Sequence, residues 1–256
     1  MGIFDWLRRS EPQDSVNEFA ARHKWLAGGY GNSEDPADPS QVLAMQLVLH
    51  IEKKDPPRRS DVLAAAASSA VALCLDERCG PGGGWEQEFK AWSGARIRKV
   101  SRRARGIAWD AAQELPGVTI QSDGAEARAY VPGKVGELEQ RLRKLQINGT
   151  DLVDDEPGEP DAAYPVLWLQ AELGMTVGKA AAQVGHASML LAGAMKVDQV
   201  QAWAESGFRC SVRDAGAEQW AGLAKLVRAG KAIAVRDAGF TEVAAGSMTV
   251  IAVPGK

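Results

Sequence analysis

The chain is organised around the stretch Tyr164-Pro-Val-Leu-Trp-Leu-Gln-Ala-Glu-Leu-Gly-Met-Thr-Val-Gly-Lys-Ala-Ala-Ala-Gln-Val-Gly-His186. It opens with an apolar run of strand length, Val166 to Leu169, passes through a turn that contains Gly174 and Gly178, and continues from Lys179 as an alanine-rich helix. A strand, a glycine turn and a helix in this order direct backbone N–H groups and a cation at one point. Such a point suits a phosphate group or a developing oxyanion.

The phosphate-binding loop of nucleotide triphosphatases does not fit this stretch. That motif has four residues between its glycines and a Ser or Thr after its Lys. Here three residues separate Gly174 from Gly178, and Ala180 follows Lys179, so no hydroxyl is placed to bind magnesium. The sequence therefore excludes an NTPase of this kind.

Two ordered motifs give a more specific match. The first is Glu172-Leu173-Gly174-Met175, Gly178-Lys179, Ala181-Ala182-Gln183 and His186-Ala187. The second is Asp237-Ala238-Gly239-Phe240-Thr241-Glu242, followed by Gly246-Ser247 and Thr249-Val250-Ile251. With these motifs the chain resembles the type 2 peptidyl-tRNA hydrolase family from about Tyr164 to Lys256, a little over a third of its length.

Composition sets the outer limits of the interpretation. With 256 residues the chain has room for one or two domains, and a net charge of −3 gives no global sign of nucleic-acid binding. The three cysteines have no metal-site or disulfide spacing, which favours a reducing, cytoplasmic compartment. Only three histidines are present and no apolar run has membrane-spanning length, so we expect neither a His-rich metal site nor a membrane partner.

The domain organisation follows from an acidic, proline-containing stretch at 151–161. We expect a lead-in helix and linker at 1–40, a first domain at 41–150, the acidic linker at 151–162 and a second domain at 163–256. Both domains are predicted to be three-layer α/β/α units, in tandem, each with a small mixed four-stranded sheet and helices on both faces. In the first domain the pattern predicts a strand near 95–100 and helices at 102–114 and 135–145.

The two domains also share residues in the same order. The matched positions are Ala91-Trp92 with Ala202-Trp203, Gly94-x-Arg96 with Gly207-x-Arg209, Trp109 with Trp220, Gly117-x-x-Ile120 with Gly230-x-x-Ile233, and Pro132-Gly133 with Pro254-Gly255. Chance agreement is the alternative, and the common order of elements argues against it. We infer a tandem repeat of one unit.

The first copy has lost the residues that define the motif. Pro57-Arg58 stands about where Gly178-Lys179 stands in the second copy, and without gaps Ala65 takes the place of His186. Members of the resembled family are typically dimers. The resemblance therefore implies a monomeric pseudo-dimer with one working half, or a homodimer.

The resemblance implies which residues carry the chemistry. Lys179, Asp237 and Thr241 carry over as catalytic: the Lys stabilises an oxyanion or a phosphate, the Asp activates water or holds the Lys charged, and the Thr orients water or substrate. Which of them activates the water is left open. The candidate substrate-binding residues are Gly178, Gln183, His186, Gly239 and Ser247. His186 serves equally well as a hydrogen-bonding residue between helix and sheet. No cofactor and no metal are implied.

A basic run in the first domain is the candidate RNA-binding surface. Six cations fall within ten residues, and no acidic residue lies among them: Arg96, Arg98, Lys99, Arg102, Arg103 and Arg105. They are predicted to meet tRNA phosphates, with a solvated face as the alternative. The second domain departs from the family at Gln170, Val177 and Phe240, where basic residues are usual, so this run is expected to compensate.

The resulting prediction is an enzyme, a carboxylic ester hydrolase that cleaves the ester between a peptide or N-blocked amino acid and the 3′ end of tRNA, in a cytoplasm of bacterial type. The first copy is expected to aid tRNA binding. Two alternatives stay open: a non-catalytic protein that binds tRNA or the ribosome, and an enzyme of tRNA-dependent acyl transfer.

Overall fold

The first of two β-sheets is built around a strand that is almost entirely apolar. The computed structural model describes residues 12–31, 33–147, 151–239 and 242–256. Four strands of the first sheet have the order β2-β1-β4-β3, and β5 pairs with β1. The central strand β1 is parallel to β2 and antiparallel to β4 and β5. The strands are β1 (Leu43–His50), β2 (Arg98–Ala104), β3 (Gly117–Ser122), β4 (Ala125–Tyr130) and β5 (Gly133–Lys134).

The second sheet repeats the pattern of the first. Its strand order is β7-β6-β9-β8, with β6 parallel to β7 and antiparallel to β9, and with β8 antiparallel to β9. Its strands are β6 (Val166–Gln170), β7 (Ser211–Ala215), β8 (Ile233–Arg236) and β9 (Met248–Val253). The predicted fold class, α/β with two small mixed sheets, is confirmed.

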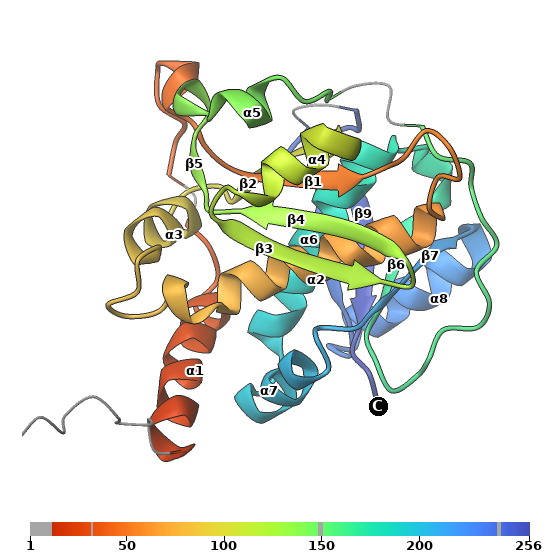
Figure 1. Cartoon of the computed structure of the whole chain (residues 1–256). Helices are drawn as coiled ribbons and strands as arrows, with labels where there is room; N and C mark the ends of the chain where they lie inside the picture. Colours follow the sequence, from red (N-terminus) through yellow and green to blue (C-terminus); the bar gives the residue numbers. More distant parts are fainter. Residues whose placement is uncertain (1–11, 32, 148–150, 240–241) are drawn as a thin grey trace, which may run out of the picture.

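Helices cover the outer faces of both sheets and fill the space between them (Figure 1). Helices α4 and α5 pack on the outer face of the first sheet, and α8 packs on the outer face of the second. Helices α2 and α6 lie against each other between the two sheets. The helices are α1 (Pro12–Ala27), α2 (Arg59–Leu75), α3 (Glu86–Ser93), α4 (Gly106–Gln113), α5 (Gln140–Arg143), α6 (Val177–Ala194), α7 (Val197–Glu205) and α8 (Ala217–Arg228). None of the described helices is long and apolar enough to span a bilayer.

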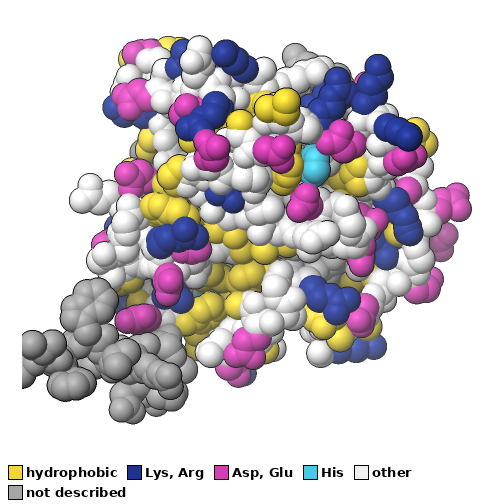
Figure 2. Space-filling view, viewed as in Figure 1, with side chains coloured by type: hydrophobic (Ala, Val, Ile, Leu, Met, Phe, Trp, Pro, Cys, Tyr) yellow, Lys and Arg dark blue, Asp and Glu magenta, His cyan; other side chains and the backbone are white. Residues whose placement is uncertain are grey.

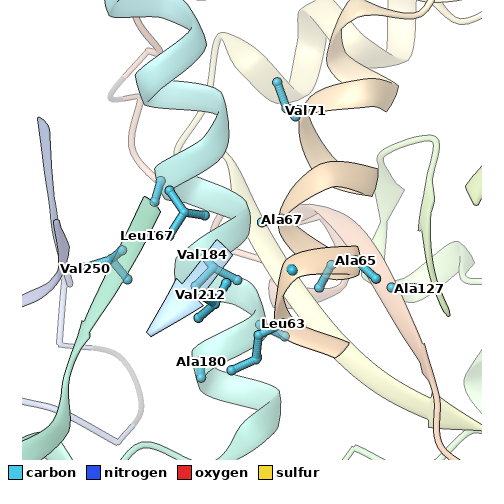
Figure 3. Close-up of a cluster of buried hydrophobic side chains, with 14 of the residues drawn as sticks. Leu63, Ala65, Ala67, Val71, Ala127, Leu167, Ala180, Val184, Val212 and Val250 are labelled. Atoms are coloured by element: carbon cyan, nitrogen blue, oxygen red, sulfur yellow. The ribbon is translucent and has the colours of Figure 1, made fainter. Parts of the chain in front are cut away.

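The central helices belong to one hydrophobic core that both halves share (Figure 3). Leu63 of α2 and Leu167 of β6 are both completely buried in it. Small residues bring the two helices close together: a Cβ atom added to Gly185 of α6 would lie 3.3 Å from the Cβ atom of Ala70 of α2. Two serines tie the halves further, since Ser188 Oγ donates to the Ala67 carbonyl and Ser68 Oγ donates to the Phe208 carbonyl, each at 2.7 Å. The halves therefore share a helical layer.

The first half differs from the predicted elements in two places. Strand β2 begins at Arg98 and runs to Ala104, because it stays paired with β1 from Ala44 to His50, so the following helix starts only at Gly106. The predicted helix at 135–145 is reduced to a 3-10 turn at 135–137 and the single-turn α5. The Val135 N–H donates to the Val42 carbonyl at 2.9 Å, which holds this segment to the start of β1.

Equivalent tryptophans mark the correspondence between the halves. Trp92 Nε1 donates to the Arg98 carbonyl at 2.9 Å, and Trp203 Nε1 donates to the Arg209 carbonyl at 2.7 Å. The residue before each carbonyl has a positive φ, +45° at Ile97 and +57° at Phe208. Arg98 is thus the residue that matches Arg209, and the predicted pairing of Arg96 with Arg209 is two residues out of register.

The acidic linker is docked on the first half. The Asp155 carboxylate accepts hydrogen bonds from the Ser60 N–H at 2.9 Å and the Ser60 hydroxyl at 2.5 Å, in the first turn of α2. Asp154 pairs with Arg59, with Oδ1 3.3 Å from Nε. Negative charge is favourable at a helix N-terminus, which explains why this segment lies there.

Candidate functional site

The loop that follows β8 places a carboxylate beside the first turn of α6. Both oxygens of Asp237 are used: Oδ1 accepts the Gly239 N–H at 2.7 Å, and Oδ2 accepts from Lys179 Nζ and, at 3.0 Å, from Gln183 Nε2. Gly239 has φ +81°, and a Cβ atom there would lie 2.7 Å from Ala245. A glycine is therefore required where the loop turns back on the carboxylate.

Lys179 and Asp237 form a nearly buried ion pair. Their side chains are 10% and 7% exposed, so water screens the attraction only weakly. Thr249 of β9 completes the network, since its hydroxyl donates to Gln183 Oε1 at 2.5 Å. That bond orients the amide so that its NH₂ group faces the carboxylate. Four side chains from α6, β9 and the loop thus hold one another in place.

A second carboxylate ties the same loop to the start of α6. Thr176 is the N-cap residue, and its hydroxyl accepts the Lys179 N–H at 3.2 Å. Glu242 accepts from the Thr176 N–H at 3.0 Å and from the Thr176 hydroxyl at 2.7 Å. Thr176 therefore links the first turn of α6, which carries Lys179, to Glu242 of the loop.

The site opens onto a chamber of about 1200 Å³ that lies between the two halves. The second half contributes the first turns of α6 and the β8 edge with its loop, and the first half contributes the start of β2 with neighbouring loops. Its charged and titratable lining includes Arg96, Arg98, Lys99, Lys179, His186 and Asp237.

The basic residues of the first half are divided between the chamber and the interior. Arg96 and Arg98 line the chamber rim and share the carboxylate of Asp35, with Arg96 Nη1 at 3.4 Å and Arg98 Nε at 3.2 Å. The Arg98 guanidinium lowers the pKa of the Asp35 carboxyl, chiefly through its hydrogen bond. Lys99 also lines the chamber.

The other three members of the run lie elsewhere. Arg102 is buried, and its guanidinium donates to Gln46 Oε1 at 2.9 Å and to the Leu145 carbonyl at 3.1 Å. Arg103 donates to Gln146 Oε1, with Nε at 3.0 Å. Arg105 is exposed. Four members of the run thus lie on the edge strand β2, while Arg96 precedes the strand and Arg105 follows it. Arg102 belongs to the interior of the fold.

His186 meets the first half directly. Its Nδ1 lies 3.1 Å from Lys99 Nζ, and burial lowers its pKa well below the usual value, with the charges of Lys99 and Lys179 acting in the same direction. Lys99 itself has its pKa lowered to about 7 because burial disfavours its charge. The helix-to-sheet contact predicted as the alternative role of His186 is present, and His186 also lines the chamber.

The structure brings together most of the residues that the sequence predicts for the site. Lys179, Gln183 and Asp237 are in contact, and Gly178 and His186 line the same chamber. Gly239 and Ser247 act through their backbones, since the Ser247 carbonyl accepts the Asp237 N–H at 2.9 Å. Thr241 lies outside the described residues.

Three contacts of the site were missed from the sequence. Thr176 follows the N-cap rule for a Thr just before a helix and could have been found from it. Thr249 and Glu242 belong to the second motif, but nothing in their spacing indicates a contact with Gln183 or Thr176. Such contacts depend on tertiary structure.

The surroundings of Asp237 limit what it does chemically. Among the described residues, three hydrogen bonds occupy three of roughly four acceptor positions on the carboxylate, so the described contacts leave one position for water or substrate. Lys179 carries three N–H donors and lies in the first turn of the helix, near the positive end of its dipole. The pair therefore provides a fixed cation beside a carboxylate with one open acceptor position.

On the face in Figure 2, Lys and Arg side chains are interspersed with Asp and Glu side chains. No group of three or more His, Cys, Asp or Glu residues with metal-binding geometry occurs among the described residues. The chamber is the place where sequence motif, buried charge and volume coincide.

Residues 165–256 match the sequence profile of the family described as peptidyl-tRNA hydrolase PTH2. The resemblance predicted from the sequence is confirmed over these residues. No curated protein matches the chain significantly. At the level of this family, the match supports a hydrolase acting on peptidyl-tRNA, in the half that carries Lys179 and Asp237.

Proposed function

We propose that this protein hydrolyses the ester that joins a peptide, or an N-blocked amino acid, to the 3′-terminal ribose of tRNA. The observation that carries the proposal is the buried Lys179–Asp237 pair at the wall of a large chamber, within the residues that match the family. The reaction needs a placed water, a cation near the developing oxyanion and a proton for the leaving ribose oxygen.

The geometry supports a division of these tasks within the site. Water held at the open acceptor position of Asp237 attacks the ester carbonyl carbon, and the Lys179 ammonium stabilises the negative charge that forms on the carbonyl oxygen. The C–O bond to the ribose then breaks, and the proton lost by the water reaches the ribose oxygen. Gln183 and Thr249 hold the carboxylate in place. Thr241 keeps its predicted role of orienting water or substrate.

The first half is proposed to bind the tRNA. Arg96 and Arg98 line the chamber, Arg98 on strand β2 and Arg96 just before it, so we expect a terminal phosphate to reach them while the ester reaches Lys179. Arg103 and Arg105 continue the same edge towards the outside. Asp35 must give way for a phosphate to bind the two rim arginines, because its carboxylate occupies them.

A tandem duplication accounts for this arrangement. The equal strand order of the two sheets and the equivalent Trp92 and Trp203 contacts support it. Under this proposal the first copy, 41–150, has become a binding domain and the copy at 163–256 has kept the catalytic loop. The chain would work as a monomeric pseudo-dimer in the cytoplasm, with a homodimer as the alternative.

Product analysis tests the proposal against its two alternatives. N-acetyl-aminoacyl-tRNA, labelled in the acyl group, is incubated with the full chain in EDTA, with and without an added amine acceptor. Hydrolysis predicts that all label appears as the free N-acetyl amino acid. Label on the added amine would favour acyl transfer. Intact substrate that stays bound to the protein would favour a non-catalytic tRNA-binding protein.

A further inference from the structure

One contact joins the non-catalytic half to the wall of the catalytic chamber through a cation and an imidazole. The side chain of Lys99 extends from β2 of the first half and contacts His186 on α6, with Lys99 Nζ 3.1 Å from His186 Nδ1. His186 follows Lys179 by seven residues, so the two share a face of α6. Both line the chamber.

The Lys99 ammonium is held in place by uncharged groups. Its Nζ lies 2.9 Å from the Met189 sulfur and 4.9 Å from the centre of the Trp92 ring. Trp92 is completely buried and anchored by its bond to the Arg98 carbonyl. Among the described residues no carboxylate lies within ion-pair distance of Lys99. The imidazole nitrogen is therefore its principal hydrogen-bond acceptor.

The chemistry of the two groups fixes the state of the imidazole. An ammonium has three N–H donors and no acceptor, so His186 must accept at Nδ1. A neutral imidazole that accepts at one nitrogen carries its proton on the other. A protonated imidazole would present a second donor to the ammonium and lose the bond.

We propose that Lys99 is a positioning residue that holds His186 neutral with its proton on Nε2, so that this N–H binds an oxygen atom of the substrate in the chamber. The proposal rests on the proposed function for the identity of that substrate, the acylated 3′ end of tRNA. It makes the first half part of the site, because without Lys99 nothing described fixes the tautomer.

The corresponding place in the second half lacks this pair. Cys210 follows Arg209 as Lys99 follows Arg98, and its sulfur contacts Ser68 Oγ at 3.6 Å and the Ala64 carbonyl at 3.7 Å. A thiol beside a hydroxyl provides neither a positive charge nor an imidazole whose tautomer could be fixed. The Lys–His contact is therefore specific to the chamber with Lys179.

The other charges of the chamber act on the same imidazole. Lys179, on the same face of α6, adds to the effect of Lys99, while its partner Asp237 offsets part of its charge. The remaining charged groups that line the chamber are Arg96, Arg98, Arg236 and Glu242. Cations outnumber carboxylates here, which also favours an uncharged His186. Below pH 7 Lys99 carries its proton, so the constraint is strongest there.

Nitrogen-15 NMR of the histidine rings tests the tautomer directly in the full chain. The protein has three histidines, and comparison with His186→Gln assigns the signal of interest. At pH 6 we expect His186 to be neutral with a protonated Nε2. An imidazolium signal, or a proton on Nδ1, would overturn the proposal whether or not the protein hydrolyses peptidyl-tRNA.

The variant Lys99→Met tests the cause, since it keeps much of the volume and removes the charge. We expect His186 to lose its fixed tautomer and to titrate at higher pH, while Lys134→Met, which alters a half-exposed lysine of the same half that pairs with Glu137, leaves the signal unchanged. In hydrolysis assays the acid limb of the kcat profile should move up by roughly one pH unit in Lys99→Met.

An unchanged His186 signal and an unchanged profile in a folded Lys99→Met protein would contradict the role of Lys99. Absence of hydrolysis in wild type, with the tautomer as expected, would contradict only the proposed function.

Discussion

At the residue scale, the site depends on a few side chains whose partners lie far away in sequence. Lys179, Gln183 and Asp237 could be predicted, because their identities and local spacing carry the family resemblance. Thr249 is part of the second motif, but its contact with Gln183 arises only when β9 lies beside α6. The burial of Arg102 likewise could not be predicted from the sequence, since a run of cations does not show which of their side chains point into the interior.

The first prediction concerns Thr249, whose hydroxyl holds Gln183. In Thr249→Val the buried Gln183 Oε1 loses its donor, so the free energy of unfolding should fall by about 1–3 kcal/mol. The freed amide also holds Asp237 less firmly, so kcat for ester hydrolysis should fall with little change in KM. Urea denaturation and steady-state kinetics measure the two effects. Thr249→Ser keeps the hydroxyl and should behave like wild type; equal losses in both variants would show that the methyl group, not the hydroxyl, matters.

The second prediction is a pH dependence of stability that comes from Lys99. Burial lowers its pKa from 10.5 to about 7 in the folded state, so between these values the unfolded chain binds more protons than the folded one. The stability contributed by this group therefore rises with pH across that window. Lys99→Met should be most favourable relative to wild type near pH 7 and should lose that advantage towards pH 10. Urea denaturation at both pH values measures it, and a constant difference between the two proteins would contradict the assignment.

At the element scale, the edge strand β2 carries residues that we propose to bind RNA, and its first residues line the chamber. A strand near 95–100 was predicted, but the observed strand runs from Arg98 to Ala104. The positive φ of Ile97 and the hydrogen bond from Trp92 to the Arg98 carbonyl delay the start of the strand, and neither leaves a sequence signal. The 135–145 segment shows the same limit, since an amphipathic charge pattern did not reveal its backbone bond to β1.

The third prediction tests whether Asp35 competes with phosphate for the β2 rim. Asp35→Asn removes the carboxylate shared by Arg96 and Arg98, so tRNA should bind several-fold more tightly at low salt. Glu34→Gln makes the same change in net charge one residue away, without a described contact to either arginine. Filter binding over a salt series compares the two variants. Equal affinities would show a general charge effect and would contradict the rim as a phosphate site.

At the scale of the whole molecule, the two halves share one hydrophobic core, so we expect them to unfold together. The tandem α/β class was predicted from the order of strands and helices. The layer that α2 and α6 form together was not predicted, because the sequence of an alanine-rich helix does not indicate which sheet or helix it packs against. This sharing also explains how Lys99 of one half reaches His186 of the other.

The fourth prediction follows from the common core. Leu63→Ala in α2 removes a fully buried side chain and should cost about 2–5 kcal/mol of unfolding free energy. Because the core is shared, circular dichroism and tryptophan fluorescence should report one urea transition, shifted as a whole. Leu167→Ala in β6 is the matched change in the other half. Two separate transitions, each moved by only one of the variants, would contradict a single cooperative unit.

The measurement that bears most directly on the account is single-turnover release of tRNA from N-acetyl-aminoacyl-tRNA. Wild type is compared with Lys179→Met and Asp237→Asn, and with the exposed controls Lys231→Met and Asp198→Asn. We predict metal-independent release by wild type and both controls, and a loss of about 10²–10³-fold in Lys179→Met, the size typical of removing a group that stabilises an oxyanion. Asp237→Asn should be impaired to a comparable degree. Release at the wild-type rate by a folded Lys179→Met and a folded Asp237→Asn would contradict the assignment of this site.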